Sequence, residues 1–290
     1  MKTKTRYRQK RLFYPLIRLN LVLAIILTFL SCATSPQKRG FIMDNSGMVL
    51  CYAGPEITTL VIPPHAKGRA ISAIGDKAFF MRTGIITLDF SHCRTLTSIG
   101  DEAFFGCESI SNLDFSNCPA LVVIGTQAFA NCYGIANLKL SGCRSLASIK
   151  ESAFVDCKSL AVIDFSGCTA LTDINESAFA GCENIIRVNF SECTGLTSIE
   201  KAAFANCLNL TNADLSACTM LNSIGTWAFS GCPRTVVTLP ASISEIAEDA
   251  FGTVDSIADY RCKEVIVPNE SVKKLVTDSG YTGKITVQNR

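Results

Sequence analysis

Cysteine is the residue type in this sequence whose number and spacing could do chemistry. Of the 290 residues, 15 are cysteine, and twelve of these fall into two series that share a period of 25 residues. The first series is Cys93, Cys118, Cys143, Cys168, Cys193 and Cys218, and the second is Cys107, Cys132, Cys157, Cys182, Cys207 and Cys232. Thiols in such series could form disulfides, bind zinc or act as nucleophiles.

The spacing argues against disulfides and zinc. Side chains on stacked repeats project in parallel about 4.8 Å apart, whereas bridged Cβ atoms converge at about 3.8 Å. A zinc site needs four converging ligands, and the only two histidines, His65 and His92, lie in different segments. We therefore predict free, buried thiols and no metal site.

Other catalytic patterns are also missing from the sequence. Ser, Asp and Lys are plentiful, but the repeat explains their positions, and no Gly-rich phosphate loop or nucleophile elbow occurs. We expect a protein without catalytic residues or cofactor, although an unrecognised enzyme stays a minor alternative.

Charge and composition narrow the class of protein further. The chain is 48% hydrophobic and 18% charged, which excludes disorder. The net charge of +2 is misleading, because residues 1–31 hold seven Lys/Arg and no acidic residue; the remainder has 20 basic and 25 acidic residues. A nucleic-acid partner is therefore not expected.

The N-terminus has the pattern of an export signal. Basic residues precede the apolar run 21–30, which is too short for an ordinary membrane span, and Ser31-Cys32 follows directly. A small residue before Cys in this position resembles the lipobox of bacterial lipoproteins, so we predict that Cys32 is the lipidated N-terminus. Because Phe29 departs from the usual aliphatic residue, cleavage at a plain signal-peptidase site or retention as an anchor remains open.

A repeat must position the two cysteine series. Ala-Phe pairs recur every 25 residues, and an Ile precedes each Ala by four positions. The pairs lie at 78–79, 103–104, 128–129, 153–154, 178–179, 203–204 and 228–229, and a shorter, atypical unit ends the series at 250–251. Recurrence of whole units at a fixed period predicts stacked repeats that share one core.

One unit, residues 110–124, follows the skeleton L-x-x-L-x-L-x-x-C-x-L of leucine-rich repeats. In it, Leu113 and Phe115 would point inward and Asp114 outward, as in a half-buried strand. The Gly-x-x-Ala-Phe stretch that follows is expected to pack a helical or 3-10 turn on the core. These features predict an α/β solenoid of the leucine-rich repeat type, with a parallel β-sheet on the concave face, short helical or 3-10 segments on the convex face, and caps at both ends.

The units at 99–107 and 243–251 resemble BspA-type leucine-rich repeats, over roughly residues 41–275. Residues 41–50 resemble the opening hairpin of that family, and 265–268 with 271–275 resemble its closing strand and helix. The resemblance implies a surface or secreted protein of a host-associated bacterium that functions in adhesion. The 25-residue units depart from the 23-residue spacing that is commoner in the family.

These observations divide the chain into five parts. We expect a lipoprotein signal peptide (1–31), a tether (32–40), an N-terminal cap hairpin with the first strand (41–70), a leucine-rich repeat array (71–252) and a C-terminal cap (253–290).

The outward positions of the predicted strands are the candidate ligand site, because packing does not constrain them. Lys139 interrupts a column of Asp, and Val162 and Arg187 interrupt a column rich in Asn. The predicted site residues are Asn112, Asp114, Asn137, Lys139, Val162, Asp164, Arg187, Asn189, Asn212 and Asp214. A recurring Ser column beside them, from Ser91 to Ser216, is interpreted as a solvated hydroxyl ladder.

An extended, polar, mildly acidic surface fits a broad partner better than a small molecule. We therefore predict an adhesin-like lipoprotein, exported and held at the outer membrane or cell surface by its lipid, that binds a protein or glycan on host matrix, host cells or other microbes. The alternative is a structural or assembly scaffold of the envelope without an external ligand.

Overall fold

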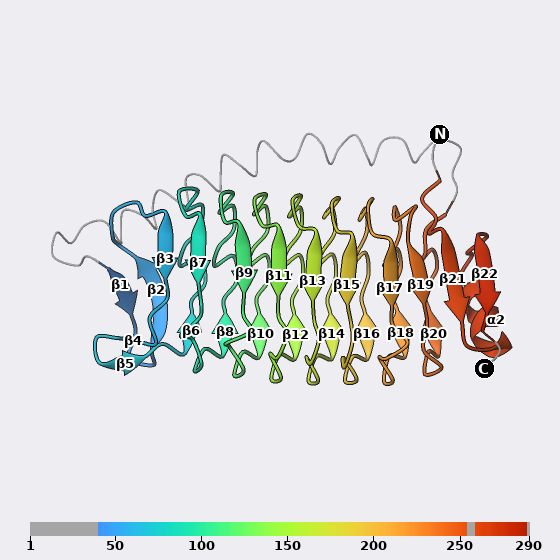
Figure 1. Ribbon diagram of the computed structural model, residues 1–290, viewed down its shortest axis with the longest axis horizontal. Helices are drawn as coiled ribbons and strands as arrows, with labels where there is room; N and C mark the ends of the chain where they lie inside the picture. The colour runs from blue at the N-terminus through green and yellow to red at the C-terminus, as the bar shows by residue number, and fades with distance from the viewer. Residues whose placement is uncertain (1–39, 254–258, 289–290) are drawn as a thin grey trace.

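The computed structural model describes residues 40–253 and 259–288. The repeats stack into a parallel β-solenoid, in which each coil contributes one strand to each of two sheets (Figure 1). The predicted signal peptide, most of the tether and Cys32 lie outside the described residues.

The eight-stranded sheet is built from the strand of each repeat unit, and neighbouring strands are parallel and in register at the repeat period. Its strands are β9 (Asn112–Asp114), β11 (Asn137–Lys139), β13 (Val162–Asp164), β15 (Arg187–Asn189), β17 (Asn212–Asp214), β19 (Val236–Thr238), β21 (Glu264–Val267) and β22 (Lys284–Val287). A parallel pair, β3 (Thr59–Val61) and β7 (Thr87–Asp89), precedes β9 in the same row (Figure 1).

The ten-stranded sheet lies on the other side of the coils and consists mostly of two-residue strands that end at the repeated Ile. Its strands are β1 (Phe41–Met43), β2 (Met48–Tyr52), β6 (Ala73–Ile74), β8 (Ser98–Ile99), β10 (Val123–Ile124), β12 (Ser148–Ile149), β14 (Asp173–Ile174), β16 (Ser198–Ile199), β18 (Ser223–Ile224) and β20 (Glu245–Ile246). This second sheet was not predicted.

Different elements stand at the two ends of the solenoid. At the N-terminal end, β1 and β2 form an antiparallel hairpin, and a second hairpin joins β4 (His65–Ala66) to β5 (Arg69–Ala70). At the C-terminal end, α2 (Glu270–Asp278) follows β21, and its N-cap Asn269 accepts a hydrogen bond from the backbone N–H of Val272. Val272 and Val276 of α2 are buried against the core.

The short helical or 3-10 segments predicted for the convex face are absent from the described repeats, where consecutive turns take their place. In residues 101–106, the N–H of Phe105 bonds locally to Glu102, but the N–H of Phe104 bonds to Ala128 in the next coil. Glu102 and Gly106 also have left-handed φ values of 53° and 66°. A helix would need successive local bonds and right-handed φ values, so the stacking itself prevents it.

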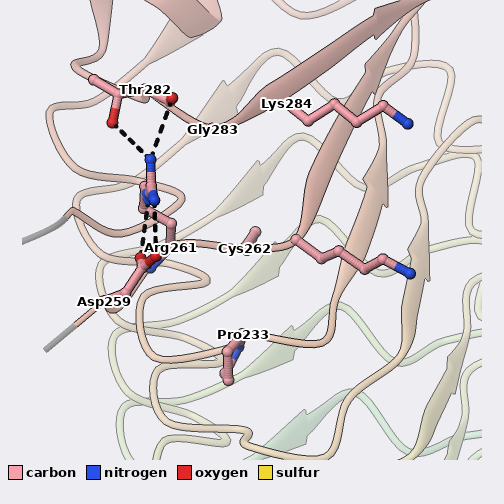
Figure 2. Close-up of a pocket in the computed structure, with 8 residues that line it drawn as sticks. Pro233, Asp259, Arg261, Cys262, Thr282, Gly283 and Lys284 are labelled. Atoms are coloured by element: carbon pink, nitrogen blue, oxygen red, sulfur yellow. Dashed lines mark hydrogen bonds and ion pairs between the residues drawn. The ribbon is translucent and has the colours of Figure 1, made fainter.

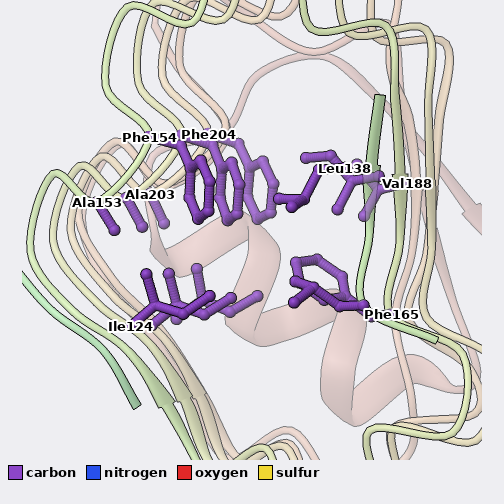
Figure 3. Packing of buried hydrophobic residues seen from close by; sticks show 14 of the residues in the cluster. Ile124, Leu138, Ala153, Phe154, Phe165, Val188, Ala203 and Phe204 are labelled. Carbon is purple, nitrogen blue, oxygen red and sulfur yellow. The ribbon is translucent and has the colours of Figure 1, made fainter. Parts of the chain in front are cut away.

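The core is a continuous row of stacked aromatic rings. From Phe79 to Phe229, successive Phe rings of the Ala-Phe pairs lie 4.9 to 5.5 Å apart and are nearly parallel. Figure 3 shows Phe154 and Phe204 in this row, with the repeated Ile beneath and the strand residues opposite. Burying one such side chain stabilises the fold by about 1.5–3 kcal/mol, which a single repeat cannot achieve alone.

Candidate functional site

The ten predicted site residues share one surface, here called the strand face: the outward side of the eight-stranded sheet from β9 to β17. Each strand places its first and third residues outward and buries its middle residue in the core. The first column contains Asn112, Asn137, Val162, Arg187 and Asn212; the second contains Asp114, Lys139, Asp164, Asn189 and Asp214. Both columns are exposed or half-buried.

The second column has a structural role that the sequence analysis missed. The side chain of Asp114 accepts a hydrogen bond of 2.9 Å from the backbone N–H of Ser116, two residues later. The same contact recurs at Asp89, Asp164, Asn189 and Asp214, over 2.7–3.1 Å. The Asp/Asn-x-Ser spacing is the signal for such Asx turns. Most of this column therefore caps the end of the strand.

Lys139 is the exception in the second column. An ammonium group has no acceptor, so Lys139 cannot cap its turn as Asp and Asn do. Its Nζ instead lies 3.4 Å from Oδ2 of Asp114 on the neighbouring strand. Both side chains are about half exposed, at 51% and 55%, and such a pair contributes only about 0–1 kcal/mol. Lys139 thus makes a weak ion pair in place of the turn hydrogen bond that Asp or Asn would make.

The first column differs from strand to strand. Asn137 Nδ2 donates to Asn112 Oδ1 over 2.9 Å, so these two amides satisfy each other. Two strands further on, the exposed guanidinium of Arg187 makes no hydrogen bond or ion pair within 40–253 and 259–288. A cation with no partner among the described residues is a candidate binding group on this face.

Apolar side chains flank Arg187. Val162 is its half-buried register partner on β13, and Ile186, which precedes it in the chain, is 53% exposed. We call Val162, Ile186 and Arg187 the Arg187 patch. Ile186 was not among the predicted residues, although a large apolar residue stands at this position only here and at Ile86 among the units from 85 to 211, which was a signal for it.

The pKa values of two Asx-turn carboxylates, Asp89 on β7 and Asp114 on β9, lie below their ordinary value. The backbone N–H of Ser91 and then its hydroxyl lower the pKa of Asp89. Partial burial acts to raise the pKa of Asp114, but the hydrogen bonds from Ser116 and the charge of Lys139 outweigh it, so the pKa lies below its ordinary value. These two carboxylates therefore stay charged through neutral and mildly acidic pH.

The cysteine series are buried and reduced, as predicted. The twelve thiols, together with Cys262, are free and buried. In the second series Cys107 Sγ donates to Phe79 O and Cys132 Sγ to Phe104 O, both over 3.1 Å. The thiols therefore link one coil to the carbonyl of the preceding coil, at weak hydrogen-bond strength.

Burial also makes these thiols poor nucleophiles. It raises the pKa of Cys107 and of Cys118 to about 12, and that of Cys132 well above its ordinary value. At neutral pH such groups carry almost no thiolate. Within the described part of the chain, no cluster of His, Cys, Asp and Glu could hold a metal ion.

The predicted lipidation site Cys32 lies outside the described residues, so lipidation stays a prediction. Across 40–253 and 259–288, no helix combines the length and apolar character needed to cross a bilayer.

Comparison with known proteins finds one family. The family model described as the BspA-type leucine-rich repeat region matches residues 72–211 and 172–268. No curated protein matches the chain.

Two solved structures illustrate the similarity. A leucine-rich cell surface protein of Faecalibacterium prausnitzii is 17% identical, with a TM-score of 0.47, over 89% of this chain and 95% of that one. A leucine-rich repeat protein of T. pallidum is 18% identical, also with a TM-score of 0.47, over 88% of this chain and all of that one (100%).

Proposed function

This chain belongs to the family of BspA-type leucine-rich repeat proteins, and from that premise we propose that it is an exported surface lipoprotein whose strand face binds a protein or glycan ligand. The repeats form a rigid scaffold, because each coil shares its backbone ladders and aromatic row with its neighbours. The scaffold sets the spacing of outward side chains and leaves their chemistry free to vary.

The observation that carries the proposal is Arg187, whose guanidinium has no hydrogen-bond or ion-pair partner among the described residues and has Val162 as its register partner and Ile186 before it in the chain. Several outward polar groups on nearby strands bond to one another: Asn189 Nδ2 donates to Asp164 Oδ1 over 2.9 Å, and Asn137 donates to Asn112. The guanidinium of Arg187 makes no such hydrogen bond with the described residues, and the apolar side chains of Val162 and Ile186 reduce the hydration of the surface around it. Arginine is one of the residue types enriched at the hot spots that dominate binding energy.

Lys139 extends this centre along the face. It lies on β11, Arg187 lies on β15, and β13 runs between them; Lys139 is the third residue of its strand and Arg187 the first, so their backbone positions are about 12 Å apart at ordinary strand spacing. A ligand that contacts both must span three coils. This geometry favours an extended segment of protein or glycan over a small molecule.

The proposed function is tested by charge reversal. The full chain is immobilised, and binding of host matrix proteins and of microbial surface glycans is measured for the parent, Lys139→Glu, Arg187→Glu and the double variant. We expect the double variant to lose roughly tenfold or more in affinity and most of its salt dependence.

The matched control reverses equal charge on the other side of the coils. Lys150 and Lys201 are exposed and flank the ten-stranded sheet, so Lys150→Glu with Lys201→Glu makes the same change in net charge. Equal loss in this control, or no loss in the strand-face variant, would contradict the assignment. Protease treatment of whole cells separates an exposed adhesin from the alternative, an internal envelope scaffold, because only the former would be cleaved.

A further inference from the structure

A second candidate site lies far from the centre of the strand face, where the last coils meet the C-terminal cap. A cavity of about 430 Å³ opens there between the segment around Arg261 and the loop that enters β22 (Figure 2). Its volume lies within the usual range of ligand sites, about 300–1,000 Å³.

Arg261 fixes one wall of this cavity. Its Nε and Nη2 donate to the two carboxylate oxygens of Asp259 over 2.9 and 2.8 Å, and Nη1 donates to the carbonyl and hydroxyl oxygens of Thr282 (Figure 2). Behind it, the hydroxyl of Tyr281 donates to the carbonyl oxygen of Cys262 over 3.0 Å. Two segments distant in sequence are therefore locked together, so a ligand meets a preorganised site.

Two lysines give the cavity a positive charge. Lys284 is held by Glu264, with Nζ 2.9 Å from Oε1, and Glu264 is itself only 13% exposed and bonded to the hydroxyl of Thr286. Lys263 also lines the cavity and makes no side-chain hydrogen bond or ion pair with the residues that the structure describes. Three cations, Arg261, Lys263 and Lys284, therefore line the cavity. Asp259 pairs with Arg261 and Glu264 pairs with Lys284, so the charge of Lys263 is the one that stays uncompensated there, although acidic residues outnumber basic ones in the chain after residue 31.

The remaining lining is suited to hydroxyl groups. The carboxylate of Asp259 is 53% exposed and keeps lone pairs that Arg261 does not use, and the hydroxyl of Thr282 opens onto the same space. Pro233 supplies an exposed apolar surface at the rim. Sugars present this combination of hydroxyls and apolar ring faces.

We propose that this cavity binds an acidic saccharide, a sugar carrying carboxylate or sulfate groups, with the anionic group on Lys263 and Lys284 and the ring hydroxyls on Asp259 and Thr282. The site is separate from the Arg187 patch, so it stands whether or not the strand face binds a ligand.

Titration calorimetry on the full chain at low salt tests this proposal with three probes: a galacturonic acid trimer, a heparin-derived tetrasaccharide and neutral maltotriose. We expect at least one of the charged probes to bind and maltotriose to fail. Because heparin carries carboxylates as well as sulfates, binding of the galacturonic acid trimer identifies the carboxylate as the recognised group, and binding of the heparin tetrasaccharide alone identifies the sulfate. Lys263→Gln should weaken binding roughly tenfold, while Lys263→Arg should retain it. Lys263→Gln leaves the contact between Lys284 and Glu264 intact, so the cap should keep its fold, which circular dichroism checks.

Lys274→Gln is the matched control, because Lys274 lies on α2 in the same cap but outside the cavity, paired with Asp278. The proposal is overturned if neither charged probe binds, if maltotriose binds equally well, or if Lys274→Gln weakens binding as much as Lys263→Gln.

Discussion

Lys139 lies between Asp114 and Asp164 in one column of the strand face but forms an ion pair with Asp114 alone, over 3.4 Å. Asp164 accepts a hydrogen bond from Asn189 instead, over 2.9 Å. The column therefore divides into pairs of neighbouring coils, and Lys139 occupies a position where an Asp or Asn would cap the turn. At this position the chain has a charged side chain in place of one that would stabilise the turn. Such a position is a candidate for selection by a ligand.

This relationship predicts that Lys139→Asn stabilises the fold. Asn at this position can accept from the backbone N–H of Ser141, as Asn189 accepts from that of Ser191, and one such bond contributes about 0.5–1.5 kcal/mol. Urea unfolding of the parent and the variant measures the change. The reverse exchange, Asn189→Lys, removes contacts to Ser191 and Asp164 and should destabilise by about 1 kcal/mol. A less stable Lys139→Asn would contradict the role assigned to the column.

The cysteine series predicts a packing effect at Cys168. Its Sγ is buried and donates to Leu140 O over 3.2 Å, so Cys168→Ala should cost on the order of 1 kcal/mol through lost contacts. Cys168→Ser should differ from Ala by the cost of burying a hydroxyl, partly offset by its hydrogen bond. Denaturant unfolding measures both, and an exposed site, Thr169→Ala, serves as the control.

Burial predicts chemical inertness of the cysteines, and a raised thiol pKa adds to it at residues such as Cys107 and Cys118. In the native protein at pH 7, a thiol reagent should leave the thirteen buried cysteines unmodified, and it should titrate them after unfolding. Mass spectrometry that finds disulfides between successive members of one series would refute this account.

Stability should fall in acid because of the Asx turns. The pKa values of Asp89 and Asp114 are lowered in the folded state, so their contribution is fully present above the unfolded value of about 3.9 and is lost as pH falls through the folded values. Asp114→Asn keeps the acceptor for Ser116 but has no titrating proton. Between pH 5 and pH 2, the free energy of unfolding of this variant should therefore decrease less than that of the parent, by the contribution of Asp114 alone. An unchanged pH profile would show that Asp114 does not contribute.

Replacement of Cys32 tests the predicted anchor. If Cys32 carries the lipid, Cys32→Ala should release or mislocalise the protein, because acyl chains contribute about 0.8 kcal/mol per buried CH₂. Detergent partitioning and labelling with a radioactive fatty acid measure the effect. Unchanged partitioning, or an acyl label that persists in the variant, would rule out lipidation at this residue.

Much of the fold could be predicted because the period of the sequence is also the period of the stack. Once Leu113 and Phe115 recur every 25 residues, parallel strands in register follow, and Cys118 must enter the shared core. The outward position of Lys139 and Arg187 follows from the same alternation. These features depend on residue type and spacing alone.

The tertiary structure decided the features that depend on which groups come into contact between neighbouring coils and between distant segments. Turns replaced the expected helical segments because Phe104 and its equivalents donate their N–H groups to the next coil, a competition that exists only after stacking. Stacking likewise places Lys139 beside Asp114, whereas the guanidinium of Arg187 has no partner in the part of the chain that the structure describes. At the C-terminal cap, where the period ends, only the folded chain brings Arg261 to Thr282, because no repeat pattern relates the two segments.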